Sequence, residues 1–222
     1  MDRILVINPN STETVTHGID EAMVPMRIAG GPEIECMTLQ EGPPGIETQQ
    51  HVDGVIPHLV RVVREKQADY AAFVIACYSD PGLYSVREAT TKPVLGISEC
   101  GILTALTLGQ KFGVIAILQK SIPRHLRYMG AMGVMQRLAA ELPVGLGVTE
   151  LSDEKKTFGR MVEVGTALRD QHGANVVVLG CAGMARYRKP LQDAIGLPVV
   201  EPSQAAVGMA IARVRLGWAG SV

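Results

Sequence analysis

The sequence predicts an α/β protein built on parallel sheets, and three observations support this prediction. Short apolar runs rich in Val and Ile recur without alternating polar and apolar residues, which is typical of parallel strands covered on both faces. Most runs are followed by a turn signal and a longer amphipathic stretch, as in repeated strand–helix units. The second half of the chain also repeats features of the first.

Six apolar runs are expected to be strands because they are short, continuous and bounded by turn residues. They are Ile4–Ile7, Tyr70–Ala76, Pro93–Ile97, Phe112–Ile117, Asn175–Leu179 and Leu197–Val200. Two stretches with a weaker pattern are each expected to add a strand, near Ile34–Thr38 and near Gly145–Glu150.

The amphipathic stretches between these runs are expected to be helices that cover the sheets. They are Ser11–Val24, Val52–Lys66, Pro81–Thr90, Glu99–Leu108, Ile122–Met132, Asp153–His172, Met184–Ala194 and Ser203–Leu216.

An internal repeat is centred on two cysteines. One apolar run leads into Cys77 and another into Cys181; a Pro-Val segment follows 16 positions after the first and 17 after the second. We therefore predict two similar halves that meet face to face. The first comprises residues 1–97 together with 205–222, and the second comprises residues 98–204, so that the last helix crosses back to the first half.

Composition and charge exclude several classes of protein. The 222 residues are 47% hydrophobic and 19% charged, which fits a globular protein, and the net charge of −1 gives no footprint for nucleic acid or an anionic membrane. No apolar run approaches the roughly 20 residues that span a bilayer, and the short run at the N-terminus does not fit a signal peptide. A cytoplasmic protein with no nucleic-acid or membrane partner is expected.

The four cysteines, Cys36, Cys77, Cys100 and Cys181, lie far apart in a chain without an export signal, so reduced thiols are expected. No C-x-x-C or histidine spacing indicates a metal site. The chain also lacks a phosphate loop, a dinucleotide fingerprint, a nucleophile elbow and the H-E-x-x-H zinc motif. The five histidines show no ligand spacing and are assigned to the surface or to helix faces. We expect neither a metal nor a cofactor.

Cys77 and Cys181 are the candidate catalytic residues, because both lie at the carboxyl ends of strands, where parallel sheets bind ligands. Each is expected near a helix N-terminus, which favours thiolate. If the halves face each other, one thiol removes a proton from a bound molecule and the other returns one to the opposite face. The alternative is that two buried apolar cysteines coincide at these points by chance, and this interpretation is kept for Cys36 and Cys100.

Candidate binding residues surround the cysteines. Asn8, after the first strand, either caps the next helix or binds a substrate carbonyl. Tyr78 and Ser79 are expected to offer side-chain donors. The small residues Ala182 and Gly183 are expected to let backbone N–H groups approach a substrate oxygen.

The Pro/Gly-rich loop at residues 41–48 is either a connector or a wall of the site that contacts the ligand through Gly45 and Ile46. The turn at residues 80–82 is expected to cap the helix that follows it.

Four segments together resemble the aspartate/glutamate/hydantoin racemase superfamily, and most of all its hydantoin racemase branch, which includes allantoin racemases. They are Ile7–Thr12, Gly42–Glu47, Ile75–Gly82 and Leu179–Met184. The resemblance covers essentially the whole chain. It implies two flavodoxin-like (Rossmann-like) halves related by a pseudo-twofold with the active site between them. It also implies a homo-oligomer and catalysis by the pair Cys77 and Cys181 without pyridoxal phosphate.

Differences between branches of the superfamily indicate which reaction and substrate class this chain resembles most. Glutamate racemases typically carry Cys-Asn-Thr and Cys-Thr-His at the two sites, whereas this chain has Cys-Tyr-Ser at residues 77–79 and Cys-Ala-Gly at 181–183. Arylmalonate decarboxylases keep only the second cysteine. At residues 117–120 this chain lacks the hydroxyl residues that related enzymes often have. The resemblance therefore implies a racemase of 5-substituted hydantoins, with allantoin as one candidate. The alternatives are an Asp/Glu racemase or other small-acid isomerase, and a non-catalytic small-molecule binder.

Overall fold

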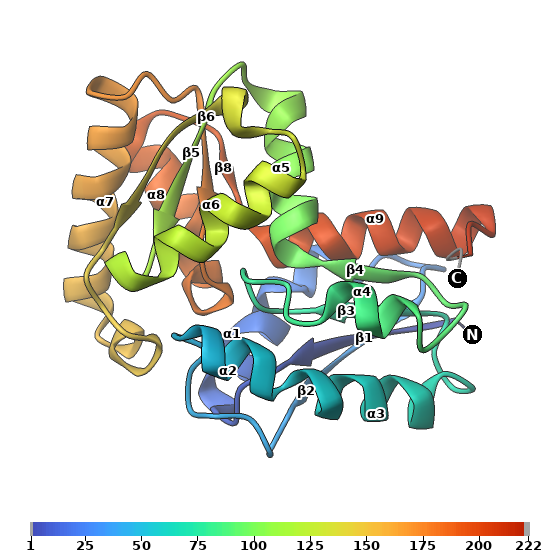
Figure 1. Cartoon of the computed structure of the whole chain (residues 1–222). Coiled ribbons are helices and arrows are strands. Elements are labelled where there is room, and N and C mark those ends of the chain that lie inside the picture. The colour runs from blue at the N-terminus through green and yellow to red at the C-terminus, as the bar shows by residue number, and fades with distance from the viewer. Residues whose placement is uncertain (1, 220–222) are drawn as a thin grey trace.

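The computed structural model describes residues 2–219 and contains two four-stranded sheets in which all strands are parallel (Figure 1). The first sheet has the order β2-β1-β3-β4 and the second β6-β5-β7-β8, so the second half repeats the topology of the first. The predicted fold class is confirmed. Residues 1 and 220–222, which the prediction assigned to the first half, lie outside the described residues.

The strands follow the apolar runs closely, because a strand covered on both faces needs an apolar side chain at nearly every position. They are β1 Arg3–Asn8, β2 Glu33–Thr38, β3 Ala72–Ile75, β4 Val94–Gly96, β5 Phe112–Ala116, β6 Leu138–Pro143, β7 Val176–Leu179 and β8 Val199–Val200.

The helices cover both faces of each sheet. They are α1 Glu13–Ala22, α2 Gln49–Gly54, α3 Ile56–Lys66, α4 Leu83–Arg87, α5 Ile97–Leu108, α6 Ile122–Ala131, α7 Glu154–Asp170, α8 Arg188–Ile195 and α9 Pro202–Leu216. Short 3-10 turns occupy residues 24–26, 119–121, 135–137, 148–152 and 182–187. The predicted helix Val52–Lys66 is thus two helices, which meet at Val55 before Pro57.

Four apolar clusters form the core, one on each face of each sheet. In the first half, α1 and α9 cover one face and α3 and α4 the other; in the second half, α7 and α8 cover one face and α5 and α6 the other. Helix α9 follows β8 of the second sheet but packs on β1, β3 and β4 of the first, as Figure 1 shows. The chain therefore crosses between the halves twice.

The strand predicted at Gly145–Glu150 is wrong. Gly145 has a φ of 77°, which no strand residue adopts, and residues 148–152 form a 3-10 turn. The strand is β6, seven residues earlier in the chain, with the sequence Leu-Ala-Ala-Glu-Leu-Pro. Alanine, glutamate and proline are depleted in strands, and proline is tolerated here because β6 is an edge strand.

Gly180, directly before Cys181, lies against the backbone of β5. Its N–H donates to the carbonyl oxygen of Ile115 at 2.8 Å, and a Cβ at this position would lie 2.5 Å from the same oxygen. We expect Gly180→Ala to lower the free energy of unfolding by about 1–3 kcal/mol, because the overlap is with backbone. Urea unfolding measures this, with Gly159→Ala on α7 as the control. A Cβ at Gly159 would meet nothing within 4 Å, so that variant gains about 0.5–1 kcal/mol. Equal stabilities of the two variants would contradict the expectation.

Candidate active site

One cavity lies where the carboxyl ends of the two sheets face each other, and both halves line it. Cys77 follows β3 and Cys181 follows β7; both are half-buried and both line this cavity. Its volume is about 30 Å³, which accommodates a few water molecules at most, since one water needs about 10–15 Å³ of such space. A substrate with a ring therefore requires the walls to move.

The structure brings most of the predicted binding residues to this cavity. Its walls include Ile46, Tyr78, Ser79, Ala182 and Gly183. The hydroxyl of Tyr78 does not serve as a donor there: it is buried and has no hydrogen-bond partner among the described residues. The ring of Tyr78 packs among the core side chains of the second half.

Asn8 is not in the cavity wall. It is 1% exposed, and its amide nitrogen donates to Asn10 Oδ1 at 3.0 Å and to Thr16 Oγ1 at 2.9 Å. Asn8 therefore fixes the loop after β1 against α1, and the residue of that loop that lines the cavity is Asn10.

The two sulfurs occupy matched settings. The backbone N–H of Ser79 lowers the pKa of Cys77, and that of Gly183 lowers the pKa of Cys181. Burial outweighs these effects: it raises the pKa of Cys77 to about 11 and that of Cys181 to about 12.

The expectation of thiolates stabilised by helix N-termini is therefore wrong. Helix α4 has five residues and begins six positions after Cys77, and Cys181 precedes a 3-10 turn rather than an α-helix. Neither sulfur faces the N-terminus of a long helix, so the effect of a helix dipole is small.

The surroundings of the two sulfurs differ in charge. Apart from burial and the nearby N–H groups, the guanidinium of Arg124 lowers the pKa of Cys77 and the carboxylate of Asp80 raises it, whereas Cys77, Glu47 and Glu201 raise the pKa of Cys181. A nearby cation thus favours the thiolate at Cys77, and the charges near Cys181 oppose it there.

Arg124, on α6, is a cavity residue that the sequence analysis did not identify. Its Nε donates to Ser79 Oγ at 3.0 Å, and its two terminal nitrogens donate to Ser121 Oγ at 3.1 Å and to the carbonyl of Glu47 at 3.2 Å. One side chain thus connects the loop after β3, the start of α6 and the Pro/Gly-rich loop. Nothing in the spacing of Arg124 along the chain signals this role.

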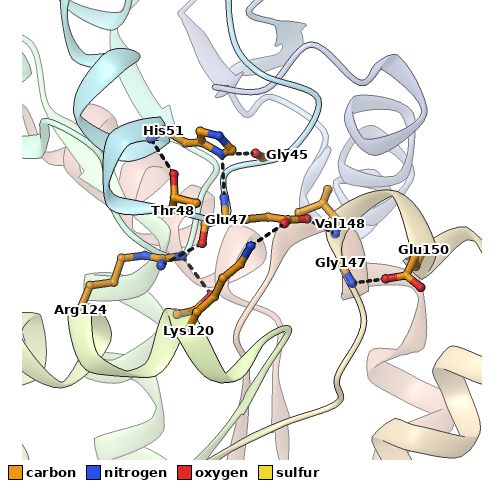
Figure 2. Close-up of polar contacts among 10 residues, drawn as sticks. Gly45, Glu47, Thr48, His51, Lys120, Arg124, Gly147, Val148 and Glu150 are labelled. Carbon is orange, nitrogen blue, oxygen red and sulfur yellow. Dashed lines mark hydrogen bonds and ion pairs between the residues drawn. The ribbon is translucent and has the colours of Figure 1, made fainter.

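Glu47 fastens the Pro/Gly-rich loop of the first half to the second half (Figure 2). Its carboxylate accepts from the N–H of Val148 at 3.0 Å and from Lys120 Nζ at 3.2 Å. The next residue, Thr48, caps α2 by accepting from the N–H of His51 at 3.1 Å. Ile46 and Val148 both line the cavity, so these contacts close one of its walls.

Gly45 allows this closure, because a Cβ at this position would lie 2.7 Å from the Cβ of Val148. The loop 41–48 is therefore a wall of the site, and not only a connector.

Asp80 holds the loop after Cys77 in place. Its carboxylate accepts from the N–H groups of Ser98 and Glu99, at 2.9 and 2.8 Å, and from the hydroxyl of Tyr128 at 2.9 Å. Asp80 thus caps α5, and not α4 as the sequence suggested. Burial raises its pKa to about 7, against the effect of these three donors.

The described residues form neither a cluster of metal ligands nor a membrane-spanning helix. Among residues 2–219, no group of three or more His, Cys, Asp or Glu side chains is arranged to hold a metal ion. In the same range, no helix combines the length and the hydropathy needed to cross a membrane.

A family model described as Asp/Glu/Hydantoin racemase matches residues 4–210. A hydantoin racemase of Paenarthrobacter aurescens is 34% identical over 97% of this chain and 92% of its own length.

Two solved structures are similar over almost the whole chain. An allantoin racemase from Pseudomonas fluorescens has a TM-score of 0.94 and 29% identity, with 99% of this chain and 93% of that chain covered. An allantoin racemase from Klebsiella pneumoniae has a TM-score of 0.90 and 30% identity, with 100% and 91% covered.

Proposed function

Because this chain belongs to the Asp/Glu/hydantoin racemase family, we propose that it racemises 5-substituted hydantoins, allantoin among them, by passing protons through Cys77 and Cys181. The observation that carries the proposal is the single cavity to which two opposed sheets each contribute a half-buried cysteine. The relatives named for hydantoin and allantoin racemisation indicate the substrate class.

The chemistry requires one thiolate and one thiol on opposite faces of the ring. The thiolate removes the proton from the stereocentre, and the negative charge that develops spreads onto the neighbouring ring carbonyl. The loops at Ser79 and at Ala182–Gly183 line the cavity, and we expect their backbone N–H groups to stabilise that oxygen. The thiol then delivers its own proton to the opposite face, which inverts the configuration.

The raised pKa values suit this exchange of roles. A buried thiolate with a pKa near 11 or 12 is a stronger base than an exposed one, and the two values differ little. Neither direction of transfer is therefore strongly favoured, as a racemase requires. Acid and base are both supplied by the chain, so the proposed reaction includes no cofactor. Homo-oligomer formation and a cytoplasmic location stay predictions.

The test is the loss of optical rotation of a chiral 5-substituted hydantoin, and of allantoin, with uptake of one deuterium at the stereocentre in heavy water. We expect both signals well above the spontaneous rate in buffer. Racemisation of aspartate or glutamate with hydantoins left unchanged would instead select the amino acid racemase. Unchanged rotation of all these substrates with folded protein would overturn the proposal.

Glu47 offers a prediction about closure of the cavity. We expect Glu47→Ala to raise KM roughly tenfold with little change in kcat, because hydrogen bonds that close the wall contribute about 0.5–1.5 kcal/mol each. The control is Glu41→Ala, in the same loop, because Glu41 pairs with Arg61 within the first half. Steady-state kinetics of both variants measure the changes in KM and kcat separately. A fall in kcat at unchanged KM would show that Glu47 does not act through closure.

A further inference from the structure

A buried carboxylate–imidazole pair lies behind Ser79, on the side of Cys77. His125 on α6 is 4% exposed, and its Nδ1 lies 2.6 Å from Oε1 of Glu141 on β6. The side chain of Glu141 has no exposed surface, and its second oxygen, Oε2, has no hydrogen-bond partner among the described residues. Burial of an acid is costly without compensation, so this pair calls for an explanation beyond packing.

The hydroxyl of Ser79 joins this pair to Cys77. Ser79 Oγ lies 3.3 Å from His125 Nε2 and accepts from Arg124 Nε at 3.0 Å, and the side chain of Ser79 lowers the pKa of Cys77. A serine hydroxyl donates one hydrogen bond and accepts two. When Ser79 donates to the thiolate, it accepts from Arg124 and from a proton on Nε2 of His125.

We propose that His125, held by Glu141, stores the proton of Cys77 and receives it through the hydroxyl of Ser79. The proton of the Cys77 thiol moves to Ser79 Oγ while the hydroxyl proton of Ser79 moves to Nε2 of neutral His125. The products are the Cys77 thiolate, an intact Ser79 hydroxyl and an imidazolium paired with the Glu141 carboxylate. No proton leaves the site, and no charge is left unpaired in it. His125 is thus a positioning residue that acts through Ser79, and this role rests on the proposed function.

Within residues 2–219, no histidine is among the groups that most strongly shift the pKa of Cys181. These groups are the N–H of Gly183, Cys77 and the carboxylates of Glu47 and Glu201. The two halves therefore repeat the position of the cysteine, but only the proposed proton acceptor of Cys77 is a histidine. Cys77 forms its thiolate by internal transfer, whereas Cys181 forms its thiolate by giving up a proton to the substrate or to water.

Several charged or titratable groups surround His125. Glu141 on β6 lies 2.6 Å from its Nδ1, and Arg124 on the same helix shares Ser79 Oγ with its Nε2. The ring of Tyr78 meets the imidazole edge-on at 5.3 Å, and Tyr128 of the same helix donates to Asp80. The contact with Glu141 is the shortest of these.

The experiment uses variants with one active cysteine. With Cys181→Ser, Cys77 alone exchanges the proton of one enantiomer with heavy water, and with Cys77→Ser, Cys181 alone exchanges that of the other. Internal transfer makes the exchange through Cys77 nearly independent of pH from about 7 to about 9. Adding His125→Asn should lower that exchange about 100-fold near pH 7 and make it rise about tenfold per pH unit, because the thiol must then release its proton to water.

The matched control is His125→Asn in the Cys77→Ser background, where exchange through Cys181 should change by less than about twofold. An equal loss through both cysteines would mean that His125 only supports the fold, and an unchanged pH profile through Cys77 would also overturn the proposal. Glu141→Gln, which keeps the shape of the pair, and Ser79→Ala, which breaks the bridge, should reproduce the change in profile. They keep the test valid if His125→Asn fails to fold.

Alkylation by iodoacetamide separates this inference from the proposed function, because it reports thiolate without any substrate. We expect His125→Asn to slow alkylation of Cys77 about 100-fold near pH 7, as it slows the exchange, and to leave that of Cys181 unchanged. If His125→Asn slows alkylation of Cys77 alone but the enzyme exchanges no hydantoin proton, the proton transfer to His125 stands and the proposed racemase activity is overturned. If the enzyme racemises hydantoins but His125→Asn does not slow alkylation of Cys77, the racemase activity stands and the proton transfer to His125 is overturned.

Discussion

Replacing either Cys77 or Cys181 by serine should reduce racemisation about 10³-fold or more, since a general acid or base contributes about 10²–10⁴-fold and serine is far less acidic than cysteine. The enantiomers of a substrate have equal free energies in water, so kcat/KM must be the same in both directions. Each single variant should therefore lose racemisation of both enantiomers equally.

Deuterium exchange reports the two cysteines separately, whereas racemisation requires both of them. The variant with Cys77 should wash deuterium into one enantiomer without inverting it, and the variant with Cys181 should do so for the other. Cys36→Ser is the control, because Cys36 is a half-buried thiol that lies on β2 and does not line the cavity. A single-cysteine variant that still racemises at more than about a tenth of the normal rate would exclude the two-thiol mechanism.

Replacing Arg124 by methionine should lower kcat/KM about 100-fold, the second largest effect expected for a single side chain. The guanidinium lowers the pKa of Cys77, donates to Ser79 and holds the carbonyl of Glu47. Loss of a hydrogen bond to a charged group costs about 1.5–3 kcal/mol, and the roles of this half-buried arginine overlap.

Two comparisons make the Arg124 result specific. Arg124→Lys keeps the charge without the planar fork and should fall between the two extremes. Arg127→Met removes an exposed arginine of the same helix, which contacts Gln49, and should remain within about twofold of the unchanged enzyme. The pH dependence of Cys77 alkylation should shift upward in Arg124→Met, and the absence of any shift would count against this assignment.

The fold and the two cysteines could be predicted from the sequence because both depend on local patterns. Continuous apolar runs identify strands that are buried on both faces, and a chain that repeats such a run before Cys77 and before Cys181 places the two thiols at equivalent strand ends. The exception was β6, an edge strand whose alanines and proline carry little strand signal.

The rest of the site depends on contacts between distant segments and could not be predicted in this way. Arg124 and His125 are neighbours on the amphipathic helix α6, and Glu141 lies in the edge strand β6. Only the packing of α6 on the second sheet brings these three side chains together near Ser79. That Asn10 lines the cavity, and not the predicted Asn8, likewise depends on which side of one loop faces α1. The pKa values of the thiols follow from burial, which position along the chain does not reveal.

The return of α9 to the first sheet has a consequence for biosynthesis. Ala206, Val207 and Ala210 of this helix complete an apolar layer over strands that were made some 110 to 200 residues earlier. On the ribosome, the N-terminal half therefore waits with part of one face of its sheet uncovered, beside α1, until the last segment emerges. The two halves cannot mature strictly in sequence, and a chain that stops short of α9 should be a target for chaperones and proteases.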